Sequence, residues 1–256
     1  MSSLPSDDRG WFELVRRNQP PFWRVLTEAC GGEVLIDRDI QAAIIPASPN
    51  RSFFNSVFYE DAGHLVDAIP RLAEAYDEAG VNAWTVWIPA DDERARAGLE
   101  EAGHRLDATP RAMGFELSDL RLPDPDPELE IRAEMDMELL RQINETAYGY
   151  PPGDFPSLAP MPDTEAYLAS LAGTTVGTTV TFDRGADTEI TLVATLPEAR
   201  GRGVARRLLG HALERERGRG KLGSTLIATK LGFPVYTGLG YRDVGGFEMW
   251  ERRKPG

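Results

Sequence analysis

The sequence is poor in cysteine and histidine, with one Cys and three His among its 256 residues. A single thiol, Cys30, has no partner for an internal disulfide, which excludes the disulfide-stapled secreted scaffolds. The scattered histidines supply no cluster with metal-ligand spacing, so we expect no metal site. The sequence also lacks an apolar run near the ~20 residues that a membrane helix needs, and a signal-peptide pattern at its N-terminus. We therefore expect a cytoplasmic protein that does not contact a membrane.

Positive charge is scarce as well, since 28 Lys and Arg stand against 41 Asp and Glu, a net charge of −13. Nucleic-acid binding draws its affinity from cations that neutralise phosphates, so we expect no nucleic-acid partner. The deficit is uneven. Residues 1–124 contain 12 basic and 22 acidic residues (−10), and residues 125–256 contain 16 basic and 19 acidic residues (−3). This asymmetry suggests two halves with different roles.

A proline-rich segment marks the boundary between these halves. Pro123, Pro125 and Pro127 alternate with acidic residues, a pattern that disfavours both helix and central strand. We therefore predict a linker over 123–128.

The two halves, 1–122 and 129–256, end alike. Residues 100–117 and 237–250 each contain a Gly-aromatic-Arg segment followed by a Phe-Glu strand, and a strand and helix precede both. The match is short, but the shared order of elements favours an ancient duplication over chance.

Hydrophobic periodicity predicts alternating helices and strands, while residues 1–50 give no clear pattern. In the first half we expect helices over 67–79 and 91–102, and strands over 83–89 and 111–117. In the second half we expect helices over 136–148, 204–216 and 233–238, and strands over 129–132, 166–171, 176–182, 189–195, 224–229, 241–243 and 247–250. Residues 149–162 contain five prolines and are predicted to form an irregular loop. The mixture predicts an α/β fold with a mixed sheet (α+β).

The sharpest local feature is a strand that enters a two-glycine loop and then an amphipathic helix. Gly201 and Gly203 allow the backbone to approach a ligand closely. The N–H groups of the helix beginning at Val204 favour a bound phosphate, and Arg200 and Arg202 add positive charge there. A tight turn with solvated arginines is the plainer interpretation. The dinucleotide-binding fingerprint is excluded because its third glycine is missing. The P-loop is excluded because the sequence has no Gly-Lys-Ser/Thr.

Two blocks of sequence carry a family resemblance. Arg200-x-x-Gly203-x-Ala205 resembles the Arg/Gln-x-x-Gly-x-Gly/Ala signature of the GCN5-related N-acetyltransferase (GNAT) superfamily. Residues 234–242 (Pro-Val-Tyr-Thr-Gly-Leu-Gly-Tyr-Arg) resemble the family's Tyr-x-x-Leu-Gly-Phe/Tyr segment, and the match spans about 129–253.

The resemblance implies two tandem GNAT-like domains, each with a mixed, mostly antiparallel sheet flanked by helices. The domain over 1–122 has no such loop between Cys30 and Trp84, so we expect it to be degenerate. Tandem GNAT enzymes with one working half have a similar plan.

The resemblance also implies acetyl-CoA as the co-substrate and names the residues that hold it. Backbone groups of Val193, Ala194 and Thr195 would pair with the pantetheine arm. The pyrophosphate would lie on the backbone amides of Arg200, Gly201, Arg202, Gly203, Val204 and Ala205. Many relatives place an asparagine seven residues before the family tyrosine, where this sequence has Thr229, whose hydroxyl can make a similar hydrogen bond.

Catalytic roles follow from the same resemblance. Tyr236 matches the tyrosine that often protonates the leaving CoA thiolate, although a core aromatic would give the same pattern. An ammonium must lose a proton before it attacks a thioester, and Glu189 is the best candidate base. A solvated glutamate that opens a strand is equally compatible with that position. Glu145, Asp154 and Asp187 are lesser alternatives.

The 144–162 segment is expected to face the acceptor. Asn144, Tyr148, Tyr150 and Phe155 give it an aromatic, polar lining of the kind that binds a small-molecule or peptide amine. The sequence thus predicts an N-acetyltransferase that works by direct transfer in a ternary complex. Two alternatives stay open: a non-catalytic acyl-CoA-binding or regulatory protein with this fold, and an acyltransferase with another donor or acceptor.

Overall fold

The computed structural model describes residues 4–254, and the chain packs as two compact units. The first unit contains the chain up to Asn18 together with Arg111–Val244, and the second contains Gln19–Pro110 together with the chain from Gly245 onward. Helix α1 (Asp8–Ala29) and strand β12 (Arg242–Arg253) therefore contribute to both units.

The predicted linker, 123–128, lies inside the first unit. Compact packing and the proposed sequence repeat thus divide the chain at different places, and the repeat stays a prediction.

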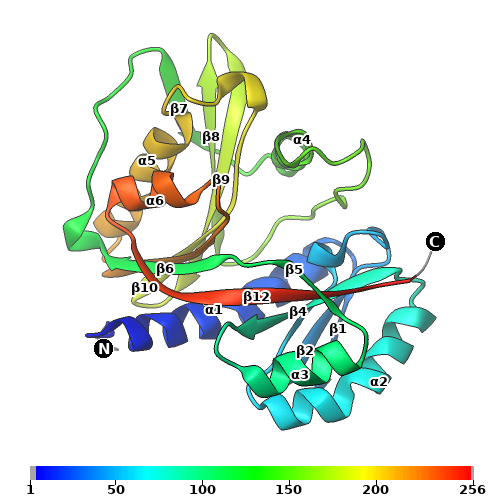
Figure 1. The fold of residues 1–256 in the computed structure, drawn as a ribbon. Helices are drawn as coiled ribbons and strands as arrows, with labels where there is room; N and C mark the ends of the chain where they lie inside the picture. The colour runs from blue at the N-terminus through cyan, green and yellow to red at the C-terminus, as the bar shows by residue number, and fades with distance from the viewer. Residues whose placement is uncertain (1–3, 255–256) are drawn as a thin grey trace. The chain divides into compact units, whose positions relative to one another are not determined.

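The first unit is built on a mixed sheet with helices on both faces. Its strands are β6 (Arg111–Glu116), β7 (Leu129–Ala133), β8 (Thr164–Leu171), β9 (Thr174–Arg184), β10 (Asp187–Thr195) and β11 (Gly223–Ala228). Its helices are α4 (Met137–Tyr148), α5 (Val204–Gly218) and α6 (Phe233–Leu239). The strand order is β6-β11-β10-β9-β8-β7, with β10 and β11 parallel and the other neighbours antiparallel. In Figure 1, α5 and α6 lie on one side of β8 and β9, and α4 lies on the other.

Capping and apolar spacing explain where these helices begin and end. Asp136 caps α4, since its carboxylate accepts a hydrogen bond from the Leu139 N–H at 2.9 Å, and Gly149 ends the helix with φ of 69°. The inner face of α5 is buried in two apolar clusters, one with β6 and β11 through Leu209 and Leu213, and one with β8 through Leu208. Burial on both sides fixes the N-terminus of α5 beside the end of β10.

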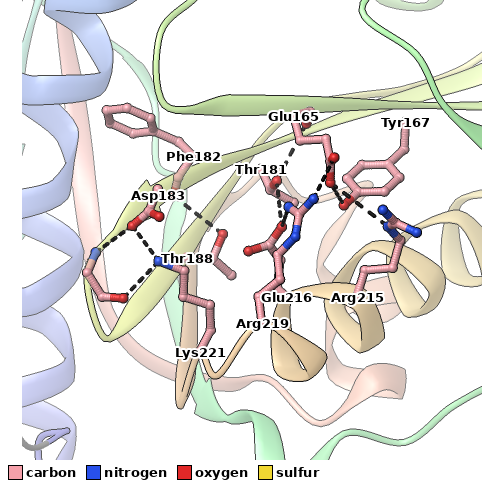
Figure 2. Close-up of polar contacts among 11 residues, drawn as sticks. Glu165, Tyr167, Thr181, Phe182, Asp183, Thr188, Arg215, Glu216, Arg219 and Lys221 are labelled. Carbon is pink, nitrogen blue, oxygen red and sulfur yellow. Dashed lines mark hydrogen bonds and ion pairs between the residues drawn. The ribbon is translucent and has the colours of Figure 1, made fainter.

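A charged cluster around the buried Glu216 fastens the far end of α5 to β8 and β9 (Figure 2). Glu216 is 3% exposed and accepts hydrogen bonds from Thr181 Oγ1 at 3.2 Å and Arg219 Nη1 at 2.9 Å. Arg219 also pairs with Glu165 at 2.7 Å, and Tyr167 donates to the same carboxylate. Burial raises the pKa of Glu165, but the hydrogen bonds from Arg219 and Tyr167 outweigh it and hold that pKa below its usual value. Glu165 therefore stays charged at neutral pH, and its pairing with Arg219 helps to fix the end of α5 against β8.

The second unit has its own sheet, two covering helices and a share of α1. Its strands are β1 (Glu33–Asp37), β2 (Ile40–Ile44), β3 (Ser56–Phe58), β4 (Ala83–Pro89) and β5 (Arg105–Ala108), together with most of β12, and its helices are α2 (Ala62–Glu78) and α3 (Glu93–Glu101). The order is β1-β2-β3-β4-β12, with β5 paired to β12 and β3 parallel to β4. Tyr76 of α2 stacks on Trp84 of β4 at 4.8 Å, and Trp23 of α1 packs against Trp87 at 6.4 Å. Since Trp84 and Trp87 point to opposite faces of β4, both faces of this sheet are covered.

The predicted fold class, a mixed and mostly antiparallel sheet flanked by helices, is confirmed. The structure departs from the predicted elements in several places, and strands β1, β2, β3 and β5 had no predicted counterpart. The two strands expected over 241–243 and 247–250 are one strand, β12. Helix α2 begins at Ala62, earlier than expected, because the Asp61 carboxylate caps it. Helix α1 had no predicted counterpart, and it contains Pro20 and Pro21, which normally argue against a helix interior.

Within residues 4–254, no helix has both the length and the apolar character required to cross a bilayer. The same part of the chain contains no group of three or more His, Cys, Asp or Glu placed to hold a metal ion.

His104, in the second unit, makes stability depend on pH. It is 3% exposed, its ring lies edge-on to Trp84 at 4.7 Å, and within residues 4–254 neither ring nitrogen has a hydrogen-bond partner. Burial, helped by the nearby Arg252 charge, lowers the pKa of His104 to about 4. The unfolded chain gains this proton near pH ~6.5 while the folded chain does not, so the free energy of unfolding falls as pH drops through this window.

We expect that loss to reach about 2 kcal/mol between about pH 7.5 and pH 5. His104→Phe keeps the aromatic contact and removes the titration, so it should lack this part of the pH dependence. Urea denaturation at both pH values measures the difference. A variant that loses stability as steeply as the wild type would refute the assignment to His104.

Candidate acyl-CoA site

Strands β10 and β11 pair at their beginnings and then diverge. Their parallel register runs from Asp187–Gly223 to Glu189–Thr225, and within the described chain it goes no further. Both strands continue, β10 to Thr195 and β11 to Ala228, while β10 stays paired with β9. One edge of β10 after Glu189 therefore presents backbone groups without a neighbouring strand, which is the arrangement that an extended ligand can join.

A bulge distorts the pairing of β10 with β9, along the stretch whose other edge is free. Its register with β9 passes from Thr191–Val180 to Ala194–Thr178, so β10 carries one extra residue. Leu192 in the bulge has φ of 47°, a left-handed conformation that a branched residue rarely adopts. The strand is thus bent where its edge becomes free.

The two-glycine loop leads from β10 to the N-terminus of α5. Gly201 and Gly203 have φ of 74° and 75°, and Gly203 is the N-cap of α5 with no side chain bonded to the first turn. A Cβ added to Gly201 would meet nothing within 4 Å, so the loop borders open space. Free N–H groups, the positive end of the helix dipole and room beside them are the features that favour a bound phosphate.

The arginines of this loop hold its backbone. Arg200 donates from Nε to the Thr195 carbonyl at 3.2 Å and from Nη2 to the Ala147 carbonyl at 2.5 Å, which ties the loop to β10 and α4. Arg202 lies 3.8 Å from the Glu128 carboxylate, and Arg207 donates to the Arg202 carbonyl at 3.0 Å. Any anion contact in the loop would therefore come chiefly from backbone amides.

Tyr236 lies on α6, the helix that follows β11 in the chain. Tyr236 is 7% exposed, and its ring is edge-on to the ring of Tyr241 at 5.9 Å. A Cβ added to Gly232 would come within 2.7 Å of the Tyr236 ring. Burial raises the pKa of Tyr236 well above the usual value for a phenol, and the nearby Tyr148 adds to the shift. The phenol therefore stays protonated at neutral pH, as a proton donor must, and the raised pKa also makes it a weaker acid than a free phenol.

Thr229 serves the turn into α6. Its hydroxyl accepts a hydrogen bond from the Gly232 N–H at 3.3 Å, and its carbonyl accepts one from the Phe233 N–H at 3.0 Å. The hydroxyl thus already has a structural partner, and its contact with CoA stays a prediction.

The carboxylates considered as bases have distinct surroundings. Glu189 is 2% exposed and is the last β10 residue that pairs with β11. Asp187 accepts a hydrogen bond from Asn18 at 2.8 Å, and burial raises its pKa. Glu145 accepts hydrogen bonds from the N–H groups of Gly153 and Phe155 at 2.7 and 3.1 Å, so it holds the 149–162 loop. Glu145 lies on α4. Of the two carboxylates on β10, Glu189 lies closer to the point where β10 and β11 diverge.

The residues predicted to face the acceptor gather on the α4 side of β10. Tyr148 stacks on Tyr150 at 6.0 Å, and Tyr150 contacts Phe155 at 6.4 Å. Tyr148 donates to the Val193 carbonyl at 3.1 Å, so one of the carbonyls expected to meet pantetheine already accepts a hydrogen bond. A carbonyl oxygen has a second lone pair and can accept another.

Asn144 is fully buried and donates from Nδ2 to the Leu140 carbonyl at 2.8 Å and to Thr178 Oγ1 at 3.0 Å. Sequence reasoning did not identify Thr178 or the bulge at Leu192. A β-strand pattern contains no signal for a single residue with positive φ.

A diverging strand edge that runs into a glycine loop at a helix N-terminus is an arrangement that suits an extended, phosphate-bearing ligand. Residues 136–231 match the model of the acetyltransferase (GNAT) family. This segment is therefore a GNAT acetyltransferase domain. No curated protein matches the chain.

Solved structures share the fold across most of the chain. A GCN5-related N-acetyltransferase from Kribbella flavida is 16% identical, with a TM-score of 0.65, and the match covers 93% of this chain and 95% of that one. A GCN5-related N-acetyltransferase from Sphaerobacter thermophilus is 18% identical, with a TM-score of 0.61 and coverage of 85% and 78%. A tandem GNAT protein from the clavulanic acid biosynthesis pathway is 13% identical, with a TM-score of 0.59 and coverage of 85% and 79%.

Proposed function

We propose that this protein is an N-acetyltransferase that transfers an acetyl group from acetyl-CoA to an amine directly in a ternary complex. The observation that carries the proposal is the free edge of β10, which runs from Glu189 past the bulge at Leu192 to the glycine loop that caps α5. A strand edge suits the amides of pantetheine, and a helix N-terminus suits a pyrophosphate. Both lie on one continuous segment in the order that CoA would need.

The described residues fit such a ligand. The backbone of Val193, Ala194 and Thr195 would pair with the pantetheine arm, and the amides of 200–205 would hold the pyrophosphate. Thr195 Oγ1 is buried and, within residues 4–254, has no hydrogen-bond partner, which is consistent with a polar ligand at this edge. Acetyl-CoA would supply the activated acyl group as a thioester.

Two side chains would move the protons. Glu189 would take a proton from the acceptor ammonium, so that the amine nitrogen can bond to the acyl carbon while the carbon–sulfur bond breaks. At ~3.3 Å per residue, Glu189 lies about 10 Å along the strand from Leu192, so the proton would pass from the amine to Glu189 through a short chain of waters. Tyr236 would give its proton to the thiolate that leaves.

The acceptor would lie against the aromatic cluster of Tyr148, Tyr150 and Phe155, beside α4. A cationic small molecule or a basic peptide suits the net charge of −13, because an acidic protein attracts cations on encounter. We interpret residues 1–122 as a degenerate GNAT-like half, because they contain no phosphate-binding loop and hold most of the negative charge.

The test is thiol release from acetyl-CoA with a panel of amines, together with calorimetric binding of CoA. We expect acetyl-CoA to bind and at least one amine to support release with formation of the N-acetyl product. Propionyl-CoA, succinyl-CoA and alcohol acceptors, run in parallel, test the acyltransferase alternative. If acetyl-CoA binds and no acceptor supports release, the protein is a non-catalytic acyl-CoA binder and the proposal is wrong.

A further inference from the structure

A chain of buried hydrogen bonds leads from α4 to the bulge in β10. Asn144 donates from Nδ2 to the Leu140 carbonyl at 2.8 Å and to Thr178 Oγ1 at 3.0 Å. Thr178 Oγ1 donates in turn to the Leu192 carbonyl at 3.3 Å. Asn144 and Thr178 are both 0% exposed, so water does not compete for these contacts.

The chemistry of the groups fixes the direction of this chain. A carbonyl oxygen only accepts, so the nitrogen end of the Asn144 amide must face Leu140. The second proton on that nitrogen goes to Thr178 Oγ1. The single hydroxyl proton of Thr178 is then left for Leu192. Thr178 makes the hydrogen bond to the bulge, and Asn144 orients the Thr178 hydroxyl that donates it.

The bulge needs such a partner. Leu192 has φ of 47°, and β9 offers no residue opposite the extra position in β10. A branched residue keeps this conformation only where its surroundings hold it. The Thr178 hydroxyl gives the Leu192 carbonyl a hydrogen bond in place of one from the regular strand ladder.

Asn144 is a costly residue in this place. Its Oδ1 is buried and, within residues 4–254, has no hydrogen-bond partner. An aliphatic side chain of similar size would leave no unpaired oxygen and would favour folding. A polar residue that opposes stability beside a strained strand is typical of a residue that serves activity rather than packing.

We propose that Asn144 and Thr178 are positioning residues for acyl transfer, an inference that rests on the proposed function. They hold the Leu192 carbonyl and so fix the bulge. The bulge in turn sets the direction of the backbone groups of Val193 and the residues after it, along the edge where the acyl-CoA would lie. Transfer depends on this alignment, because a small misplacement of reacting groups lowers the rate steeply.

The test replaces the hydroxyl without changing the shape of the side chain. We expect Thr178→Val to lower kcat about 10²-fold, while the Kd for CoA changes by less than about threefold because the pyrophosphate loop is untouched. Thr178→Ser keeps the hydroxyl and should restore most of kcat. Asn144→Leu should lower kcat similarly while its Tm equals or exceeds that of the wild type. The double variant should be no slower than Thr178→Val, because both changes act through one carbonyl.

Thr181→Val is the matched control. Thr181 is a buried threonine on the same strand, but its hydroxyl bonds to Glu216 on the α5 side of the sheet (Figure 2). This variant should lose stability and keep its kcat. A purely structural role for Thr178 predicts instead that both valine variants behave alike.

Hydrogen exchange of the peptide 188–197 gives a readout that needs no turnover. Exchange of the amides from Leu192 to Thr195 should be faster in Thr178→Val and Asn144→Leu than in Thr181→Val, although Thr181→Val is expected to lose stability. A Thr178→Val enzyme with wild-type kcat overturns the proposal. If the wild type turns over no acceptor, the proposed function fails separately. The positioning role of Asn144 and Thr178 is then tested by hydrogen exchange and by the ratio of the Kd values for acetyl-CoA and CoA. Wild-type values of both in Thr178→Val would overturn it.

Discussion

Replacing Gly203 with glutamate should abolish measurable binding of acetyl-CoA, with a rise in Kd of at least about 10²-fold, equivalent to about 2.7 kcal/mol. Gly203 is the N-cap of α5, and its φ of 75° lies in the region that glycine favours. A carboxylate at this point would repel the pyrophosphate and compete for the first-turn N–H groups that should hold it. Calorimetric titration with CoA measures the loss.

Gly220→Glu is the control for this variant. Gly220 follows the other end of α5, has φ of 89° and has nothing within 4 Å of an added Cβ. The two substitutions thus add the same charge and a similar backbone strain at opposite ends of one helix. Both should lower the Tm, and only Gly203→Glu should weaken CoA binding. Retained affinity in Gly203→Glu would show that the phosphate site lies elsewhere.

Local sequence patterns predicted the two-glycine loop before α5 well, because its backbone conformation is set by a few neighbouring residues. Two glycines before an amphipathic helix leave few conformations other than the observed one, in which both have positive φ. The helix over 204–216 is confirmed and extends to Gly218. The charge of Arg200 could also be read from the sequence. The direction in which the Arg200 side chain points could not be read from the sequence. Its partners are the carbonyls of Thr195 and of Ala147, which is 53 residues away.

Features set by tertiary contacts were beyond the sequence. Helix α1 contains two prolines, and its turns are held by packing, as where Trp23 meets Phe53 at 4.9 Å. The Leu192 carbonyl in the bulge accepts a hydrogen bond from Thr178 on β9, and Thr178 accepts one from Asn144 on α4. No single segment carries that information. The aromatic lining near α4 was predicted from composition, and the structure brings Tyr148 and Tyr150 together.

Tyr236→Phe should lower kcat about 10²-fold with little change in the Kd for acetyl-CoA, if Tyr236 protonates the leaving thiolate. The substitution removes one oxygen from a buried ring that is already packed on Gly232 and Tyr241, so the fold should tolerate it. Because the pKa of Tyr236 lies above the usual phenol value of about 10, wild-type kcat should show no alkaline loss from this group below about pH 10. Steady-state rates between neutral pH and that limit measure both effects.

Tyr241→Phe distinguishes acid catalysis from core packing. Tyr241 is 2% exposed, and its hydroxyl shares a hydrogen bond of 2.6 Å with Ser224, so its loss leaves a buried partner unsatisfied. We expect this variant to lose stability and keep its kcat, the reverse of Tyr236→Phe. If Tyr236→Phe instead keeps the wild-type kcat and loses only Tm, the thiolate leaves without the Tyr236 proton. Tyr236 is then a core aromatic, and catalysis rests on the alignment of the acyl group by β10 and on removal of the amine proton.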